Sequence, residues 1–129
     1  MKMIKALTEE LTKDALNYAV AIASGFSVAE LEGHDGSLCV GDVNNQCIGI
    51  LRGVPVMTVF KYGYYDPSNK WEIGGPIIER EKIRVEPDYP NGWVAQTMYH
   101  GSTLLEAAMR CFVTNKLGSE IEIPEKLLA

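Results

Sequence analysis

Two stretches of the chain, one near each end, carry apolar residues at helical intervals of three and four positions. The first stretch predicts a helix from about Lys13 to Ser24, whose apolar face consists of Ala15, Tyr18, Ala19 and Ile22. Thr12 is a suitable N-cap for this helix, because its hydroxyl can accept a hydrogen bond from a free amide of the first turn. Gly25 follows as a suitable C-terminal stop.

The second stretch predicts a helix from about Leu104 to Leu117. Thr103 and Glu106 have the spacing of a capping box, and Gly118 ends the pattern. The apolar positions of this helix are Leu104, Leu105, Ala108, Met109, Phe112 and Val113. Because each terminal helix has one apolar stripe to bury, we expect the two to pack together or side by side on a sheet.

Between the helices the pattern shortens to apolar runs separated by turn residues, which is typical of strands. The runs that predict strands are Ser27–Glu32, Leu38–Val40, Gln46–Leu51, Pro55–Lys61, Ile77–Val85, Gly92–Tyr99 and the short edge run Ile121–Ile123. A turn at Tyr89-Pro90-Asn91-Gly92 should join two of them, since Asn-Gly is a strong hairpin signal. Trp93 and Tyr99, six positions apart, would share one face of a single strand. The predicted fold class is therefore α+β: an antiparallel sheet with N- and C-terminal helices packed on one face.

The segment from Tyr62 to Pro76 follows neither periodicity and is predicted to be a loop, because its glycines and prolines disfavour a long helix or a central strand. Loops of about 15 residues are uncommon unless they serve a function. Aromatic rings can stack on a base, and adjacent glycines can expose amide donors to an anion. The predicted ligand-binding residues are Tyr65, Ser68, Lys70, Trp71, Gly74, Gly75, Arg80 and Arg110. The alternative is that Trp71 fills the core and the glycines only make a turn.

Composition limits the classes of function. The 129 residues suit a single domain spanning residues 1–129, since domains commonly have about 100–150 residues. The formal net charge of −5, without any run of Lys or Arg, argues against duplex nucleic acid and anionic membranes as partners. The longest apolar stretch, Tyr18 to Ala23, is too short to cross a bilayer, and no signal peptide is recognisable, so we expect a cytoplasmic protein.

Candidate chemistry is sparse. Cys39, Cys47 and Cys111 are odd in number and lack a Cys-x-x-Cys spacing, so we expect three reduced, mostly buried thiols rather than a metal or redox site. His34 and His100 are expected to be solvated turn residues, and no nucleophile elbow or phosphate-binding loop is present. The sequence therefore predicts no catalytic residue, no metal and no cofactor.

Arg110 lies within the apolar run of the C-terminal helix, one position beyond Met109. One interpretation is a surface arginine whose stem lies along apolar neighbours and whose charged head reaches water. The other is a partly buried arginine that pairs with a carboxylate or a ligand.

Three segments resemble the NinX-type family, small proteins of unknown function encoded in accessory regions of tailed-phage genomes. They are Asp14 to Ala23, Asp66 to Glu81, and Ala107 to Val113 with its continuation through Lys116-Leu117-Gly118 to Ile121-Glu122-Ile123-Pro124. Family members often read Pro-Ser-Thr-Asp-Trp where this chain reads Pro67-Ser68-Asn69-Lys70-Trp71, so Lys70 stands in place of an acidic residue. The resemblance implies a phage accessory protein in the cytoplasm of the infected host, and it implies no activity.

Three functions remain open from the sequence. The first is a non-enzymatic, homo-oligomeric protein that sequesters a small anionic, nucleotide-like host signal as an anti-defence measure. The second is a protein-interaction module that acts on a host protein, and the third is a hydrolase with an unrecognised site. An aromatic-lined pocket with Arg or Lys would favour the first, a flat apolar patch the second, and clustered acids with a histidine the third.

Overall fold

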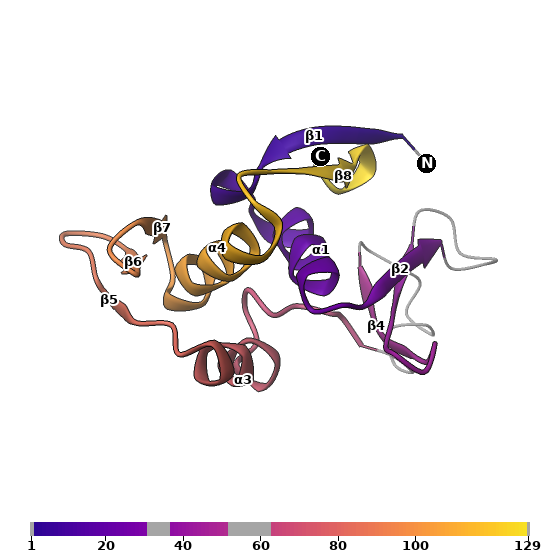
Figure 1. Ribbon diagram of the computed structural model, residues 1–129, viewed down its shortest axis with the longest axis horizontal. Coiled ribbons are helices and arrows are strands. Elements are labelled where there is room, and N and C mark those ends of the chain that lie inside the picture. The colour runs from indigo at the N-terminus through magenta and orange to yellow at the C-terminus, as the bar shows by residue number, and fades with distance from the viewer. Residues whose placement is uncertain (1, 31–36, 52–62, 129) are drawn as a thin grey trace.

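The computed structural model describes residues 2–30, 37–51 and 63–128 (Figure 1). In chain order the elements are β1 (Met3–Leu7), the 3-10 helix η1 (Thr8–Glu10), α1 (Lys13–Ala23), β2 (Ser27–Glu30), β3 (Leu38–Gly41), β4 (Cys47–Leu51), α3 (Trp71–Glu81), β5 (Val85–Pro87), β6 (Trp93–Ala95), β7 (Tyr99–Gly101), α4 (Leu104–Leu117), β8 (Glu120–Pro124) and the 3-10 helix η2 (Glu125–Leu127). The predicted α+β class is confirmed. The described strands, however, form three small antiparallel sheets rather than one.

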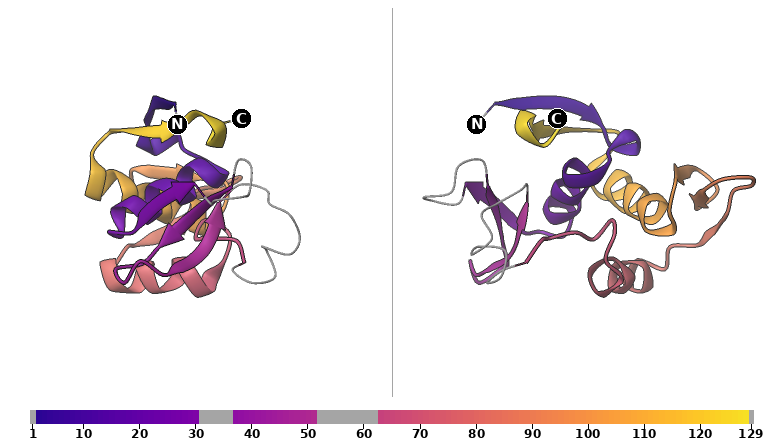
Figure 2. Two further views of the ribbon diagram at one scale, coloured as in Figure 1. Left: turned by 90° about the vertical axis from the view of Figure 1, so that its right-hand side faces the viewer. Right: turned by 180° about the vertical axis from the view of Figure 1, so that it is seen from behind.

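The three sheets surround a central pair of helices. The sheet orders are β1-β8, β2-β3-β4 and β5-β6-β7. Figures 1 and 2 show the β1-β8 ribbon on one side of α1 and α4, and α3 on the opposite side. The ribbon pairs the two ends of the chain, with Met3 opposite Pro124 and Leu7 opposite Glu120. The sequence analysis did not predict β1, because its partner lies at the other end of the chain.

The core lies where α1 packs against α4, as the apolar stripes of the two helices predicted. Leu16 and Val20 of α1 are fully buried, and so is Met109 of α4, while Phe112 is 2% exposed. Burying a side chain of this size stabilises the fold by roughly 1.5–3 kcal/mol. The bounds predicted for α4 are confirmed, and the Thr103 side chain caps the helix by accepting from the Glu106 amide at 3.1 Å.

The prediction of a loop up to Pro76 followed by a strand from Ile77 is wrong, because residues Trp71–Glu81 form the helix α3. Tertiary packing outweighs the low helix propensity of the glycines here. A Cβ at position 74 would collide with the carbonyl oxygen of Pro67 and would lie 2.8 Å from Leu105 Cδ2 on α4. Gly74 therefore allows α3 to lie close to both neighbours, and Pro76 is tolerated inside the helix.

The prediction of one strand from Gly92 to Tyr99 is also wrong. The chain turns at Gln96 and Thr97, whose φ angles are 52° and 58°, and β6 and β7 pair across this turn. Two consecutive left-handed residues make a hairpin turn that usually contains Asn or Gly, so the sequence lacked the expected signal. Trp93 and Tyr99 consequently lie on neighbouring strands. The turn predicted before β6 is confirmed by the hydrogen bond from the Asp88 amide to the Gly92 carbonyl, 2.9 Å long.

The cysteine prediction is only partly correct. Cys39 on β3 and Cys47 on β4 form a disulfide, with a Cα–Cα separation of 5.8 Å, whereas Cys111 is unpaired and buried. The β3-β4 hairpin brings the two residues together, and their spacing alone gave no sign of it. β2 and β4 confirm two further predicted strands. β4 begins at Cys47 rather than Gln46, and the strand predicted from Ser27 runs on into residues outside the described ones. The strand predicted at Pro55–Lys61 and the turn containing His34 lie outside the described residues.

Candidate functional site

A cleft of about 650 Å³ opens between α3, the C-terminal end of α4, β4 and the chain that leaves α1. Three aromatic rings line it, those of Phe26, Tyr65 and Phe112, and they come from distant parts of the sequence. Aliphatic side chains of β4 and α3 complete the apolar part of its wall: Ile48, Ile73 and Ile77. The volume falls within the range of about 300–1,000 Å³ that is usual for small-molecule sites.

Tyr65 forms part of the wall of this cleft. Its ring meets Phe26 edge to face, with the ring centroids 6.4 Å apart and the planes at 82°. Burial raises the pKa of Tyr65 to about 12, although a hydrogen bond with Ser24 and the charge of Arg80 act in the opposite direction. A Cβ on Gly49 would lie only 2.8 Å from the Tyr65 Cβ, so β4 closes against this tyrosine. Tyr65 is therefore held rigidly, with little of its surface free.

Two cations at the rim of the cleft meet at one carboxylate, that of Glu81, and a second carboxylate, that of Glu72, also lines the cleft. Arg80 Nε on α3 lies 2.9 Å from Glu81 Oε2, and Lys116 Nζ on α4 lies 3.4 Å from Glu81 Oε1. The hydrogen bond from Arg80 is the largest cause of a lowered pKa at Glu81, and Lys116 acts in the same direction against some desolvation. The Arg80 guanidinium carbon also lies 5.8 Å from the centre of the Phe112 ring. Positive charge is thus placed beside an aromatic surface.

The structure separates the residues that the sequence analysis assigned to one ligand site. Tyr65 and Arg80 line the cleft. Ser68 and Trp71 line a different hollow of about 180 Å³, on the side of α3 that faces the start of α4. Lys70 lines neither of these two hollows, and its ammonium donates to the Tyr64 carbonyl at 3.4 Å.

The glycine pair is built into α3 and does not expose amides to a ligand. The Gly74 amide donates to the Lys70 carbonyl at 2.9 Å, as the first turn of the helix requires. The Trp71 ring lies over Gly75, where a Cβ would be 3.0 Å from its Cε3 atom. Trp71 itself is 57% exposed, so the alternative that it fills the core is wrong.

Ser68 belongs to a buried polar joint between the segment before α3 and the helix α1. Its amide donates to Asn17 Oδ1 at 3.1 Å, and its hydroxyl donates to Asp66 Oδ1 at 3.3 Å. The same carboxylate oxygen accepts from the side-chain amides of Asn17 at 2.9 Å and Asn69 at 3.1 Å. The sequence analysis missed Asn17, whose one visible signal was a polar side chain between apolar neighbours in α1.

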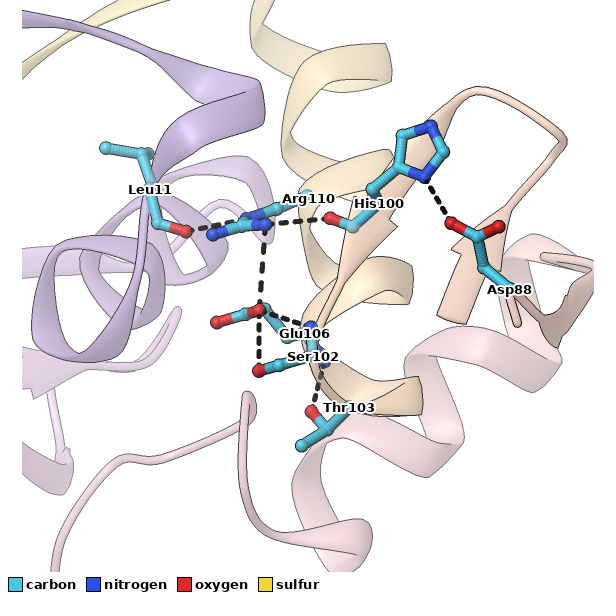
Figure 3. A network of polar contacts seen from close by, with 7 residues as sticks. All are labelled: Leu11, Asp88, His100, Ser102, Thr103, Glu106 and Arg110. Carbon is cyan, nitrogen blue, oxygen red and sulfur yellow. Dashed lines mark hydrogen bonds and ion pairs between the residues drawn. The ribbon is translucent and has the colours of Figure 1, made fainter. Parts of the chain in front are cut away.

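Arg110 lies apart from the cleft and follows the second of its two interpretations, a partly buried arginine with a carboxylate partner (Figure 3). Its Nε donates to the Leu11 carbonyl and its Nη1 to the His100 carbonyl, both at 2.8 Å. Glu106 Oε1 lies 3.6 Å from Nη1, and the Arg110 side chain is only 14% exposed. The guanidinium therefore joins α4 to the segment between η1 and α1 and to β7.

His100 makes a pair with Asp88, in which Nδ1 and Oδ2 are 2.9 Å apart and both side chains are well exposed. Figure 3 shows the imidazole directed away from Arg110 and Glu106. The hydroxyl of Ser102, the nearest candidate nucleophile in sequence, donates to Glu106 at 3.1 Å instead. Within residues 2–30, 37–51 and 63–128, no group of three or more His, Cys, Asp and Glu side chains could hold a metal ion, and no helix is long and apolar enough to cross a membrane.

Comparison with known proteins gives one family. The family model described as "Bacteriophage P22, NinX" matches residues 8–116 of the chain, a span that includes α1, α3 and nearly all of α4. Among curated proteins, none matches the sequence. The matched span contains every residue named above as lining the cleft.

Proposed function

The chain belongs to the NinX family of phage proteins, and from this premise we propose that it is a non-enzymatic binding protein whose cleft holds a small, flat, anionic, nucleotide-like ligand. In the cytoplasm of an infected host, such a protein would sequester a nucleotide signal and so oppose a defence response. We also propose that it acts as a homo-oligomer, since symmetric oligomers are common among small soluble proteins.

The observation that carries this proposal is the meeting of aromatic side chains and cations in one cleft. Phe26 and the aliphatic wall offer an apolar surface for a base, and Arg80 and Lys116 offer positive charge at the rim. Stacking of a base on an aromatic ring contributes about 1–3 kcal/mol in nucleic-acid binders. A chain of net charge −5 repels anions at long range, so an anion site on it must be local, as this pair of cations is.

A protein-interaction role is the second candidate, and one observation favours it. Trp71 is 57% exposed and Tyr64 is 42% exposed, although large aromatic side chains are usually buried. Exposed aromatics often anchor protein interfaces. In this case Trp71, rather than Arg80, would be the residue whose removal abolishes function.

The test is to identify what the protein carries in the cell. Wild-type protein and an Arg80→Ala variant would be purified from infected host cells, denatured, and the released small molecules analysed by mass spectrometry. A phosphorylated or nucleotide-like compound released by wild type, and depleted in the variant, is the expected result. If wild type releases no small molecule but co-purifies with a host protein through Trp71, the interaction role is the better account.

A further inference from the structure

We propose, on the basis of that proposed function, that the Glu81 carboxylate occupies the position that the ligand's anionic group takes on binding. Glu81 thereby selects a nucleoside with a terminal phosphate over one with a cyclic phosphodiester. The cleft would then exclude weakly charged ligands by means of a carboxylate of its own. Glu81 would be a specificity-determining residue rather than part of the binding surface.

The position of Glu81 supports this role. It is the last residue of α3, and the C-terminal end of a helix carries partial negative charge that disfavours a carboxylate. Arg80 from α3 and Lys116 from α4 nevertheless hold it at 2.9 Å and 3.4 Å. Its side chain is 25% exposed, against 57% for Arg80 and 48% for Lys116, so the Glu81 side chain is less accessible to solvent than either cation that holds it.

Displacement of Glu81 favours ligands of higher charge. A carboxylate and a phosphodiester each carry a single negative charge, so exchanging one for the other gains little Coulomb energy. A phosphomonoester carries about −1.5 to −2 charges at neutral pH and has three acceptor oxygens. It can contact both cations at once and would turn the Glu81 side chain out into solvent by like-charge repulsion.

The charges that remain on the rim limit how much negative charge the ligand can carry. Once Glu81 has turned outward, Arg80 and Lys116 together supply two positive charges, which match a phosphomonoester dianion. Glu72 also lines the cleft and opposes any further negative charge. The chemistry of the site thus favours a nucleoside monophosphate over a triphosphate, and its apolar wall faces the base.

The experiment is calorimetric titration of the full chain with adenosine, adenosine 5′-monophosphate and adenosine 3′,5′-cyclic monophosphate. Wild type would be compared with Glu81→Gln and with Glu79→Gln, a matched control at an exposed position of α3 that does not line the cleft. Wild type should prefer the monophosphate. Glu81→Gln should bind the cyclic nucleotide about tenfold more tightly, since it removes the carboxylate that competes with the ligand for Arg80 and Lys116. Glu79→Gln should behave like wild type.

The failures of the two proposals can be told apart. A wild-type preference for the cyclic nucleotide, or Glu81→Gln affinities equal to or weaker than those of wild type, would overturn the role of Glu81 and leave ligand binding in the cleft intact. The absence of nucleotide binding by wild type would overturn the proposed function itself. Thermal unfolding of each variant is the control that checks whether the protein is still folded.

Discussion

The side-chain amide of Asn17 on α1 donates a hydrogen bond of 2.9 Å to the carboxylate of Asp66, 49 positions further along the chain. The Asn17 oxygen accepts from the Ser68 amide in turn, and Asn17 itself is only 2% exposed. This joint connects the first two of the segments that resemble the NinX family. Asn17, Asp66 and Ser68 therefore hold the segment before α3 against α1 and so help to position the α3 wall of the cleft.

Replacing Asn17 with Ala should lower the free energy of unfolding by about 1–3 kcal/mol, because it leaves the buried Ser68 amide without its partner and removes one of the hydrogen bonds to Asp66 Oδ1. Urea denaturation measures the loss. Asn44→Ala is the matched control, since Asn44 lies exposed in the β3-β4 turn. If the two variants unfold at the same urea concentration, the joint does not stabilise the fold.

Lys70 is the N-cap residue of α3, yet its side chain makes no capping hydrogen bond. The family pattern Pro-Ser-Thr-Asp-Trp that this segment resembles has Asp at this position, and Asp is among the best N-cap residues. Lys70→Asp should therefore stabilise the protein by roughly 0.5–1.5 kcal/mol, through a cap and a favourable interaction with the helix dipole. Lys82→Asp, at the opposite end of α3, makes the same charge change where the dipole disfavours it and should destabilise. Thermal unfolding that ranks these two variants in the reverse order would contradict the assignment of residue 70 as the N-cap of α3.

The two glycines of α3 should respond differently to Ala. Gly74→Ala should destabilise by about 1–3 kcal/mol, because the new methyl group meets the Pro67 backbone and Leu105. Gly75→Ala should be neutral or stabilising, because its methyl group meets only the ring of the exposed Trp71 and because Ala favours a helix by up to about 1 kcal/mol. Chemical denaturation of both variants tests this. Equal losses of stability in the two variants would show that close packing against Pro67 and α4 is not what requires glycine at position 74.

Tyr65 should make the protein sensitive to alkali. Its pKa is raised from 10.0 to about 12 by burial, so its contribution to stability is fully present below pH 10 and is lost as the pH rises towards 12. Over that interval wild type should lose up to about 3 kcal/mol more than Tyr65→Phe, which cannot ionise there. Tyr18, whose pKa is also raised by burial, is present in both proteins and cancels in the comparison. Parallel stability curves above pH 10 would be inconsistent with a buried Tyr65.

The sequence predicted the elements whose signals are local. α1 and α4 have apolar stripes, and the α4 bounds were predicted without error. The predicted Thr103 cap of α4 is confirmed, whereas the predicted cap of α1 is wrong, because the Thr12 side chain makes no capping hydrogen bond. α3 was missed because Gly74 is required by a close contact with Pro67 and Leu105, which helix propensity does not report. β7 was merged with β6 because the turn at Gln96 and Thr97 uses unusual residues for left-handed angles.

The candidate site was predictable only in part, for the same physical reason. Tyr65 was selected from a segment that contained aromatics and glycines, Arg80 was selected as a cation close to that segment in sequence, and both line the cleft. Phe26, Phe112 and Lys116 were not selected, because tertiary packing alone brings them to the same place. Trp71 was the most conspicuous residue of the segment, and it points into another hollow.

The most direct test of ligand binding in the cleft is a calorimetric titration of wild type, Arg80→Ala and Trp71→Ala with a panel of linear and cyclic nucleotides. The account predicts that wild type binds one of them at micromolar concentration, that Arg80→Ala loses at least tenfold in affinity, about 1.4 kcal/mol, and that Trp71→Ala binds like wild type. Absence of binding by wild type, or a loss in Trp71→Ala with none in Arg80→Ala, would contradict it.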